Sequence, residues 1–466
     1  MYQHYFACPR HDIQIDAAQP IGALETWRHS LGQGGVNHMP LPEHVVAAVA
    51  RLSPRLIRIF IQESFDIYPA AGQFDWTRLD PYMDALARTG AHVVAAICIK
   101  PRVLFPRIDQ SVWTPNDVPA WQNVLAKMVH RYSVERPIVT HWEIGNETDI
   151  GEHGGCPYLI KDPADYYQYY RMAIDPIRQA FPTARIGGPA ACWVDNQPLP
   201  GLLELCRRDG TQLDFVSWHV YHDDPARHAA GVAKAKVMLA HHQSGRVVGG
   251  LAGFSGPRPE MMVTEMNKSF DPLSLAELAF EPRRAAAVAA GILAMLEAGL
   301  DWSFYYHIWD QTFLRKEFER FFAQPDPIMT QHWNEIPHRF GLFGVNGEVR
   351  PQYFLYWMLA RLGSGRLAGQ SDNPDLRILA GREGGRLSLM LVNYNLQSSI
   401  DRVATVRFTG LGPGRKMLTH HRIDAQCRWD QALELAPVER REIDTPQEYR
   451  CQLFCPADSV TLLSLE

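Results

Sequence analysis

Two carboxylates, Glu147 and Glu265, stand out among the residues of this chain that could do chemistry, because each comes at the end of a short apolar run. A facing pair of carboxyl groups can cleave a glycosidic bond: one protonates the leaving oxygen, and the other supports the positive charge that grows at the anomeric carbon. A single glutamate at a strand end more often pairs with an arginine. Asn146, directly before Glu147, favours the catalytic interpretation because its amide can hold a sugar hydroxyl.

The elements that must position these residues are predicted from short apolar runs that alternate with segments of helical periodicity. The expected strands are residues 21–25, 56–61, 92–99, 138–145, 185–190, 214–221, 261–266 and 302–308. The expected helices are residues 43–52, 77–89, 118–132, 164–180, 199–208, 226–242, 283–298 and 352–362. The alternation predicts an α/β fold, a closed (β/α)8 TIM barrel. A doubly wound open sheet is the alternative, but no Gly-x-Gly-x-x-Gly turn follows a strand.

The hydrophobic pattern of the sequence changes after about residue 363. Short alternating runs at 377–380, 387–394, 403–408 and 459–463 are split by Gly, Pro or Asn and indicate an all-β region. We therefore expect an N-terminal segment (residues 1–20) that joins the β region, a catalytic barrel (residues 21–363) and an accessory β-sandwich domain (residues 364–466).

The ends of the expected strands carry most of the candidate functional residues. In a TIM barrel the active groups gather at the carboxyl ends of the strands. Glu147 follows the fourth expected strand and Glu265 lies at the end of the seventh, so the two can face each other across the mouth. Other polar and aromatic side chains lie on or after the second, sixth and eighth strands: Arg58, His219, Tyr221 and Trp309.

Two of these segments resemble signatures of the large clan of retaining (β/α)8 glycoside hydrolases. Trp-Glu-Ile-Gly-Asn-Glu at 142–147 is similar to the clan's Asn-Glu signature, and Thr-Glu-Met-Asn at 264–267 to its strand-seven nucleophile segment. More narrowly, the sequence resembles glycoside hydrolase family 39, the β-xylosidase and α-L-iduronidase family. The similarity extends from about residue 24 to the C-terminus and includes the segments 214–221, 340–343, 350–354 and 458–463.

The resemblance implies that Glu147 is the acid/base, that Glu265 is the nucleophile and that Asn146 binds the 2-hydroxyl of the sugar. Such a mechanism retains anomeric configuration, with the carboxyl groups about 5 to 5.5 Å apart rather than the roughly 6.5 to 9.5 Å of an inverting enzyme. The acid needs a raised pKa and the nucleophile must stay ionised. We therefore expect Glu147 to be the drier of the two and Glu265 to receive more hydrogen bonds.

The other candidates would orient the glutamates or bind the sugar. Tyr221 and His219 can each donate a hydrogen bond to Glu265. Arg58 can orient Glu265 through a charge-assisted bond. Trp309 offers an aromatic face that can stack on a pyranose ring. Each side chain also has a purely structural interpretation, as a barrel, ion-pair or core residue.

Other kinds of active site are disfavoured. The pairs His241-His242 and His219-x2-His222 lack the spacing and intervening Glu of a zinc protease, so we expect no metal and no cofactor. No Gly-x-Ser-x-Gly elbow of a serine hydrolase is present. The loop at 152–156, which ends in Cys156, is interpreted as part of an aglycone subsite rather than as a cysteine nucleophile.

Composition and charge limit the partners. The 466 residues are 46% hydrophobic and 21% charged, which indicates a folded globular protein. The net charge of -5 and the lack of a basic stripe disfavour nucleic acid, and no apolar run approaches the roughly 18 residues of a membrane helix. The given N-terminus shows no signal peptide, and most of the eight cysteines stand singly, so we expect a reducing, cytoplasmic location unless a leader was removed.

The sequence thus predicts a retaining hydrolase that removes a terminal sugar from a small glycan or glycoside. His29 follows the first expected strand, where the family binds the terminal sugar, but Gly-Gln-Gly-Gly at 32–35 departs from the family pattern. The family allows xyloside, arabinoside, glucoside, galactoside and uronide; the matched motifs contain no Arg or Lys cluster, which favours a neutral, β-xyloside-like sugar. A transglycosylase and a non-catalytic carbohydrate-binding protein are the rivals, and the oligomeric state is left open.

Overall fold

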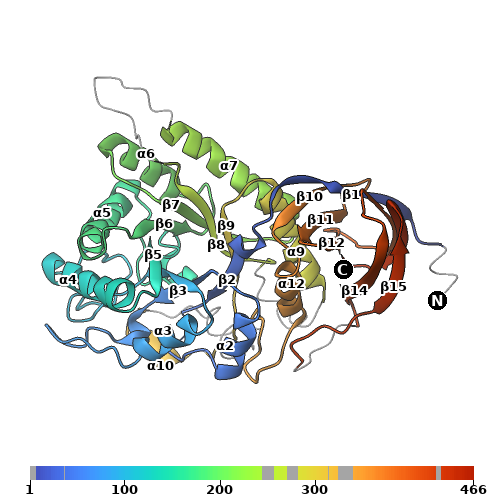
Figure 1. Ribbon diagram of the computed structural model, residues 1–466. Coiled ribbons are helices and arrows are strands. Elements are labelled where there is room, and N and C mark those ends of the chain that lie inside the picture. The colour runs from blue at the N-terminus through green and yellow to red at the C-terminus, as the bar shows by residue number, and fades with distance from the viewer. Residues whose placement is uncertain are drawn as a thin grey trace.

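The computed structural model of the chain describes residues 7–35, 37–243, 257–269, 282–312, 314–323, 340–426 and 432–466. It contains a closed barrel and a separate, mostly antiparallel sheet that lie side by side (Figure 1). The predicted TIM barrel with an accessory β domain is therefore confirmed. Cys427 lies outside the described residues.

Eight parallel strands close the barrel in chain order. They are β2 (His29–Gln33), β3 (Leu56–Ile61), β4 (His92–Ile97), β5 (Val139–Ile144), β6 (Arg185–Ala191), β7 (Phe215–Tyr221), β8 (Glu260–Asn267) and β9 (Trp302–Tyr306). Every residue of β3 is buried, as expected for a parallel strand that is covered on both faces. The closure places the carboxyl ends of β5 and β8 on opposite sides of one mouth.

Helices surround the barrel and follow the predicted segments closely. They are α2 (Glu43–Ala50), α3 (Leu79–Ala87), α4 (Val118–Val129), α5 (Pro163–Ala180), α6 (Leu199–Asp209), α7 (Pro225–Gln243), α9 (Pro282–Glu297), the short α10 (Arg315–Phe318) and α12 (Pro351–Leu359). Local sequence explains where two of them begin. Asp117 before α4 and Asp162 before α5 accept hydrogen bonds from the first-turn amides, and a proline occupies the first turn of each helix.

The accessory sheet has nine strands in the order β15-β14-β17-β12-β11-β10-β1-β13-β16. Their bounds are β1 (Arg10–Ala23), β10 (Gly365–Ser371), β11 (Leu376–Glu383), β12 (Arg386–Asn393), β13 (Arg402–Thr409), β14 (Gly414–Ile423), β15 (Glu439–Thr445), β16 (Glu448–Cys455) and β17 (Ser459–Leu465). One apolar cluster contains side chains from both ends of this strand order, for example Ile443 on β15 and Leu453 on β16. Other side chains of the sheet, such as Met390 and Leu462, belong to the core of the barrel instead, so the two parts are packed together.

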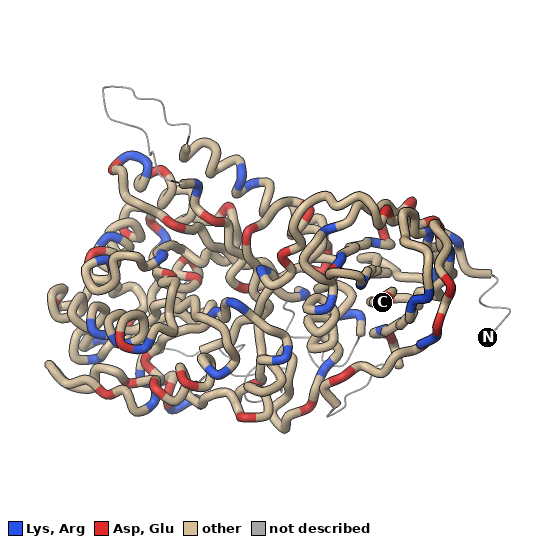
Figure 2. Tube along the Cα trace, in the orientation of Figure 1, with Lys and Arg blue, Asp and Glu red and all other residues tan. Residues whose placement is uncertain are grey.

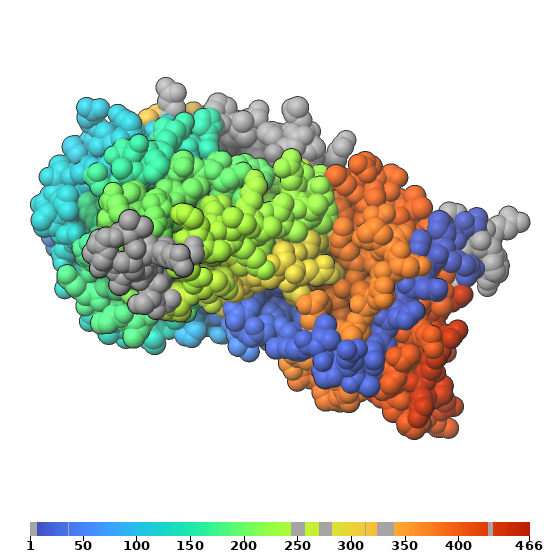
Figure 3. Space-filling view, turned by 90° about the horizontal axis from the view of Figure 1, so that it is seen from above, coloured from blue at the N-terminus to red at the C-terminus, as the bar shows by residue number. Residues whose placement is uncertain are grey.

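The expected first barrel strand, residues 21–25, is wrong. Residues 21–23 end β1, which pairs with β10 antiparallel and with β13 parallel in the accessory sheet, and Ile21 is 52% exposed. The barrel begins with β2 at His29. Figure 3 shows the N-terminal segment lying along the C-terminal strands. A strand in the N-terminal region therefore does pair with the accessory sheet, but it is longer than residues 1–20 allow.

The surface carries mixed charge. Lys and Arg are interspersed with Asp and Glu over both the barrel and the accessory sheet (Figure 2). Among the helices of the described ranges, none is both long and apolar enough to cross a membrane.

Candidate active site

The mouth of the barrel holds a cavity of about 310 Å³ that contains both Glu147 and Glu265. The other lining residues are Gly35, Phe60, Gln62, Ile150, His153, Gly154, Gly155, Cys192, Trp193, Tyr221, Ser269, Tyr306 and Phe318. They come from the segments at or after strands β2, β3, β5, β6, β7, β8 and β9. The cavity thus lies where the loops of a TIM barrel carry catalytic groups.

Arg58 on β3 lies beneath the site and is 1% exposed. Its Nε donates to Glu143 Oε2 (2.8 Å), its Nη1 to Glu265 Oε1 (2.6 Å) and its Nη2 to Asn146 Oδ1 (2.6 Å). Burial disfavours the charged guanidinium, but Glu143 and Glu265 outweigh it, and the pKa of Arg58 is raised. One fixed cation therefore orients the nucleophile candidate and the amide next to the acid candidate.

Glu265 on β8 is held through both carboxylate oxygens. Oε1 accepts from Arg58, and Oε2 accepts from the Tyr221 hydroxyl at 2.5 Å. Burial, followed by the charge of Glu265, raises the pKa of Tyr221 well above its usual value, so the phenol keeps the proton that it donates. Two donors, one of them cationic, fix the orientation of the Glu265 carboxylate.

Glu147 has a different environment. Burial and then the nearby charge of Asp149 raise the pKa of Glu147 to about 8, while Arg58 and Cys192 act in the opposite direction. The residue follows Gly145 (φ 89°) and itself has φ 43°, a conformation that costs a non-glycine residue about 1–3 kcal/mol. Its amide donates to Ala190 O at 2.9 Å, which ties the end of β5 to β6. Glu147 is thus held in a strained backbone position, and its burial and Asp149 favour the protonated acid at neutral pH.

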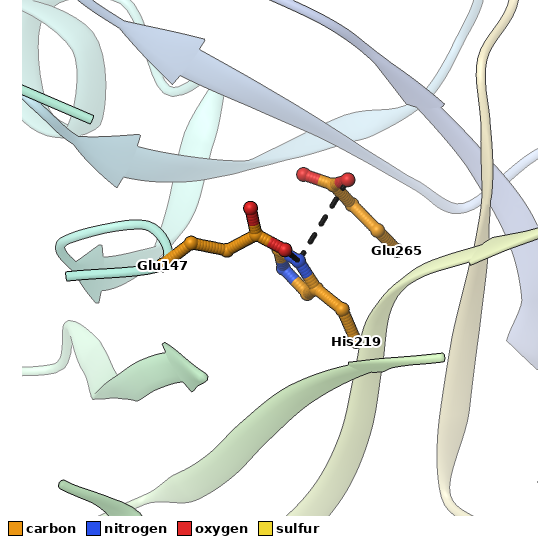
Figure 4. Close-up of side chains that lie close together, drawn as sticks. All are labelled: Glu147, His219 and Glu265. Carbon is orange, nitrogen blue, oxygen red and sulfur yellow. Dashed lines mark hydrogen bonds and ion pairs between the residues drawn. The ribbon is translucent and has the colours of Figure 1, made fainter. Parts of the chain in front are cut away.

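His219 on β7 lies between the two glutamates (Figure 4). Its Nδ1 is 2.7 Å from Glu147 Oε1 and 3.7 Å from Glu265 Oε2. The expected hydrogen bond to Glu265 is therefore made by Tyr221 alone, and the imidazole bonds Glu147 instead. Burial lowers the pKa of His219, so the ring is neutral.

The expected contrast in dryness between the glutamates is wrong. Glu147 is 8% exposed and Glu265 is 6% exposed, so the two are buried almost equally. The contrast lies in the hydrogen-bond donors: Glu265 receives bonds from Arg58 and Tyr221, whereas Glu147 meets a neutral imidazole. Charge and donor placement, rather than exposure, distinguish the two carboxyl groups.

One carboxylate oxygen of each glutamate and a nitrogen of His219 lie within 4.8 Å of one another, a grouping that could hold a metal ion. Two features of this set disfavour a cation. Arg58 already places a positive charge 2.6 Å from Glu265, and the raised pKa of about 8 keeps Glu147 protonated at neutral pH. The arrangement is better suited to proton transfer beside an ionised carboxylate.

Gly154 packs directly against Glu147. A β-carbon at Gly154 would lie 2.6 Å from Glu147 Cβ and closer still to Oε2. Its carbonyl accepts from Asn146 Nδ2 at 3.0 Å, and the next carbonyl, of Gly155, accepts from Gln62 Nε2 at 2.7 Å. The loop that the sequence assigned to an aglycone subsite thus supports Glu147 and lines the cavity.

Gly154→Ala is expected to lower kcat/KM about 100-fold, because a displacement of roughly 1 Å in a catalytic group has that effect. The added methyl group must displace the Glu147 side chain, whose other carboxyl oxygen bonds His219. Steady-state kinetics on an aryl glycoside measure the loss. Gly385→Ala is the matched control, since a β-carbon there meets nothing within 4 Å. Equal kcat/KM for the two variants would show that Gly154 does not position Glu147.

The glycines at 34 and 35, which depart from the family pattern, have a steric explanation. A β-carbon on Gly34 would lie 2.7 Å from the ring of Tyr306, and one on Gly35 would lie 2.9 Å from Phe60 and Gln62. Tyr306 also contacts Phe60 and Tyr221 edge-on. The two glycines make room for side chains that form the cavity wall.

His29 does not belong to this site. It is the first residue of β2, at the amino end of the barrel, where its Nδ1 is 2.8 Å from Ser303 Oγ. The residue lines a different cavity, with Trp27 and Arg55. The expectation is wrong because it rested on the misplaced first strand.

Trp309 is partly exposed but lies outside the described lining of the cavity. Its backbone exchanges two hydrogen bonds of 2.9 Å with the Gln33 side chain. Sequence reasoning missed Trp193 and Cys192, which follow β6 and do line the cavity. The strand-end rule that found Glu147 would also have indicated them.

Known proteins resemble this chain in sequence and in fold. A β-xylosidase of Geobacillus stearothermophilus is 21% identical over 392 residues, which are 76% of this chain and 72% of that protein. The structure of a monomeric β-xylosidase from Caulobacter crescentus CB15 has a TM-score of 0.75 at 19% identity, over 98% of this chain and 99% of that chain. The structure of a glucosidase from Croceicoccus marinus has a TM-score of 0.74 at 15% identity, over 98% and 99%. These structural likenesses show the fold.

The family comparison goes further than the fold. Residues 54–407 match the sequence model of the family described as glycosyl hydrolases family 39. The match covers more than half of the chain and spans Arg58, Asn146, Glu147, His219 and Glu265. The protein therefore belongs to glycosyl hydrolases family 39 and is an O-glycosyl hydrolase.

Proposed function

We propose that the protein is a retaining glycosidase that removes a terminal neutral sugar, β-xyloside-like, from a small glycoside. The observation that carries the mechanism is the contrast between two carboxyl groups in one cavity. Glu265 accepts hydrogen bonds from Arg58 and Tyr221, whereas burial and Asp149 raise the pKa of Glu147 to about 8. Oxygens of the two groups lie within 4.8 Å of each other, which accords with the short separation of retaining enzymes.

In the first step Glu265 attacks the anomeric carbon and forms a covalent ester with the sugar. The bond from this carbon to the leaving oxygen breaks, its electron pair goes to the oxygen, and Glu147 supplies the proton. Glu147, now ionised, then removes a proton from water, whose oxygen attacks the anomeric carbon and releases Glu265. Asn146, fixed by Arg58, is placed to bond the 2-hydroxyl during both steps.

The neutral sugar is supported by the lining of the cavity. No Lys or Arg stands among its described lining residues, so a uronate carboxylate would find no cation at the cavity surface. The similar proteins include β-xylosidases and a glucosidase, named for neutral sugars, and a bacterial orthologue of human α-L-iduronidase, named for a uronate, so the choice rests on the lining. A pyranose without a charged substituent therefore fits the site best.

Hydrolysis of an aryl β-xyloside, followed by NMR of the first-formed anomer, tests the proposal. We expect the β-anomer of xylose before mutarotation, because two displacements at the anomeric carbon restore its configuration. An α-anomer as the first product would contradict the double displacement. A panel of aryl glucosides, galactosides, arabinosides and uronides in the same assay tests the choice of sugar.

A further inference from the structure

The side of the cavity that takes the leaving group can be identified from Glu147, given the proposed hydrolase function. The acid must reach the leaving oxygen, so the leaving group lies against the segments that flank Glu147. These are the loop after β5, with Ile150 and His153, and the loop after β6, with Trp193. Phe318 on α10 adds to this wall, because the amide of nearby Ala323 donates to Glu152 Oε1 at 2.8 Å.

This wall offers aromatic and aliphatic surface. Trp193 is 40% exposed and is the only aromatic residue among the exposed large apolar side chains of the described ranges. Phe318 lies in a cluster with Phe321 and Phe322, with ring centroids 5.2 and 5.0 Å away. Ile150, in the loop after β5, also lines the cavity. A flat apolar ring that enters here would contact these aromatic and aliphatic side chains.

Two backbone carbonyls of the same wall are already engaged. The carbonyls of Gly154 and Gly155 accept from Asn146 and Gln62. A second sugar placed against this wall would give up hydrogen bonds to water and find these two carbonyls already bonded, which lowers affinity.

The wall is also fixed in place. Asp149, 7% exposed, accepts from Cys192 N at 3.2 Å and from Asn196 Nδ2 at 2.9 Å. These bonds join the loop after β5 to both ends of the short segment that carries Trp193. The segment that carries the indole is therefore held at the cavity before a ligand arrives, which favours binding of a rigid partner.

We propose that the leaving group is a flat, apolar aglycone, such as an aromatic ring, rather than a second sugar unit. Trp193 is the specificity-determining residue on this side of the site. The natural substrate class would be glycosides of aromatic or similar ring-bearing alcohols, of which the enzyme removes the single terminal sugar.

A matched pair of substrates tests this. The 2-phenylethyl and ethyl β-xylosides have leaving oxygens of similar basicity, so they differ mainly in the ring. We expect kcat/KM to be on the order of tenfold to hundredfold higher for the phenylethyl glycoside, because only its ring is buried against the wall. Xylobiose, which has the same terminal sugar, is expected to be used less well than the phenylethyl glycoside.

Variants test whether the wall causes the difference in kcat/KM between the phenylethyl and ethyl glycosides. Trp193→Ala is expected to bring the phenylethyl/ethyl ratio close to one, and Trp193→Phe to restore much of it. Val237→Ala, at a residue 71% exposed on α7, is the control and should leave the ratio unchanged. The breakdown of the glycosyl-enzyme is expected to proceed at the wild-type rate in Trp193→Ala, because the aglycone has left by then.

The outcomes separate this inference from the proposed function. A ratio near one in the wild type, better use of xylobiose, or an unchanged ratio in Trp193→Ala would overturn the apolar leaving group while the enzyme still hydrolyses xylosides. Failure to hydrolyse any glycoside of the panel, with no glycosyl-enzyme seen by mass spectrometry, would instead contradict the proposed function.

Discussion

Glu265→Ala is expected to reduce turnover by on the order of 10⁴-fold or more, since the nucleophile makes the covalent bond of the first step. The structure gives this residue no substitute. Glu143 is the other carboxylate bonded to Arg58, but it is fully buried beneath the site and bonds the guanidinium through Nε. Steady-state kinetics with an aryl β-xyloside measure the loss, and circular dichroism checks that the variant is folded.

Added azide distinguishes loss of the nucleophile from general damage. In the space left by the carboxylate, azide can attack the anomeric carbon directly and yield a glycosyl azide of inverted configuration, which NMR identifies. Glu260→Ala is the matched control, because Glu260 begins the same strand at the opposite end of the barrel and its ion pairs are near the surface. Full activity in Glu265→Ala, or equal losses in both variants, would refute the assignment.

The barrel could be predicted from the sequence because each of its strands β3 to β9 is a buried apolar run followed by a helix of clear periodicity. Seven of the eight expected strands overlap a barrel strand. The exception, residues 21–25, shows the limit of the method. β1 is apolar enough to suggest a strand, but its pairing with β10 and β13 depends on residues more than 300 positions away.

Only some strands of the accessory sheet were predicted, and the reason is physical. The runs at 377–380, 387–394, 403–408 and 459–463 lie in strands that contribute to a core, whereas β15 at the edge has mostly exposed side chains and a charged sequence. A strand whose side chains face water carries little hydrophobic periodicity. Its identity comes from backbone pairing with β14.

The candidate site was predicted from one rule, that catalytic groups lie at the carboxyl ends of barrel strands. The rule located Glu147 and Glu265, and it placed Tyr221 and Arg58 correctly beside Glu265. The rule could not decide that His219 bonds Glu147 rather than Glu265. The distances from His219 Nδ1 to the two carboxylate oxygens, 2.7 and 3.7 Å, differ by only 1 Å. Distances of this size depend on side-chain packing, which no sequence pattern encodes.

The pH dependence of the enzyme is expected to depend on Glu147. The carboxyl group must be protonated to act as the acid, and its pKa is raised to about 8. kcat/KM for a glycoside with a poor leaving group should therefore fall as pH rises through about 8. The groups that face Glu147 are Arg58, Asp149, Cys192, His219 and Glu265; of these, Asp149 contributes to the raised pKa, and Arg58 opposes it.

The same raised pKa has a consequence for stability. In the unfolded chain the carboxyl group titrates near its usual pKa of 4.5, so its contribution to stability is fully present below about 4.5, falls as pH rises from there, and is lost by about 8. Glu147→Gln removes this titration. The variant is expected to unfold at a higher temperature than the wild type above pH 8, and thermal melts at several pH values show whether it does.

Glu147→Ala is expected to slow substrates according to their leaving group. A methyl or ethyl β-xyloside should lose about 10²- to 10⁴-fold in kcat/KM, the usual contribution of general acid catalysis. The 2,4-dinitrophenolate group leaves without a proton, so kcat/KM for a 2,4-dinitrophenyl β-xyloside should stay near that of the wild type and serves as the internal control.

In Glu147→Ala the basic limb of the pH profile near pH 8 should disappear, and azide should trap the glycosyl-enzyme as a glycosyl azide of retained configuration. The retained product follows because Glu265 still forms the ester that azide displaces, whereas Glu265→Ala gives the inverted azide. Equal losses for all leaving groups, or an inverted azide product from Glu147→Ala, would contradict these roles for the two glutamates.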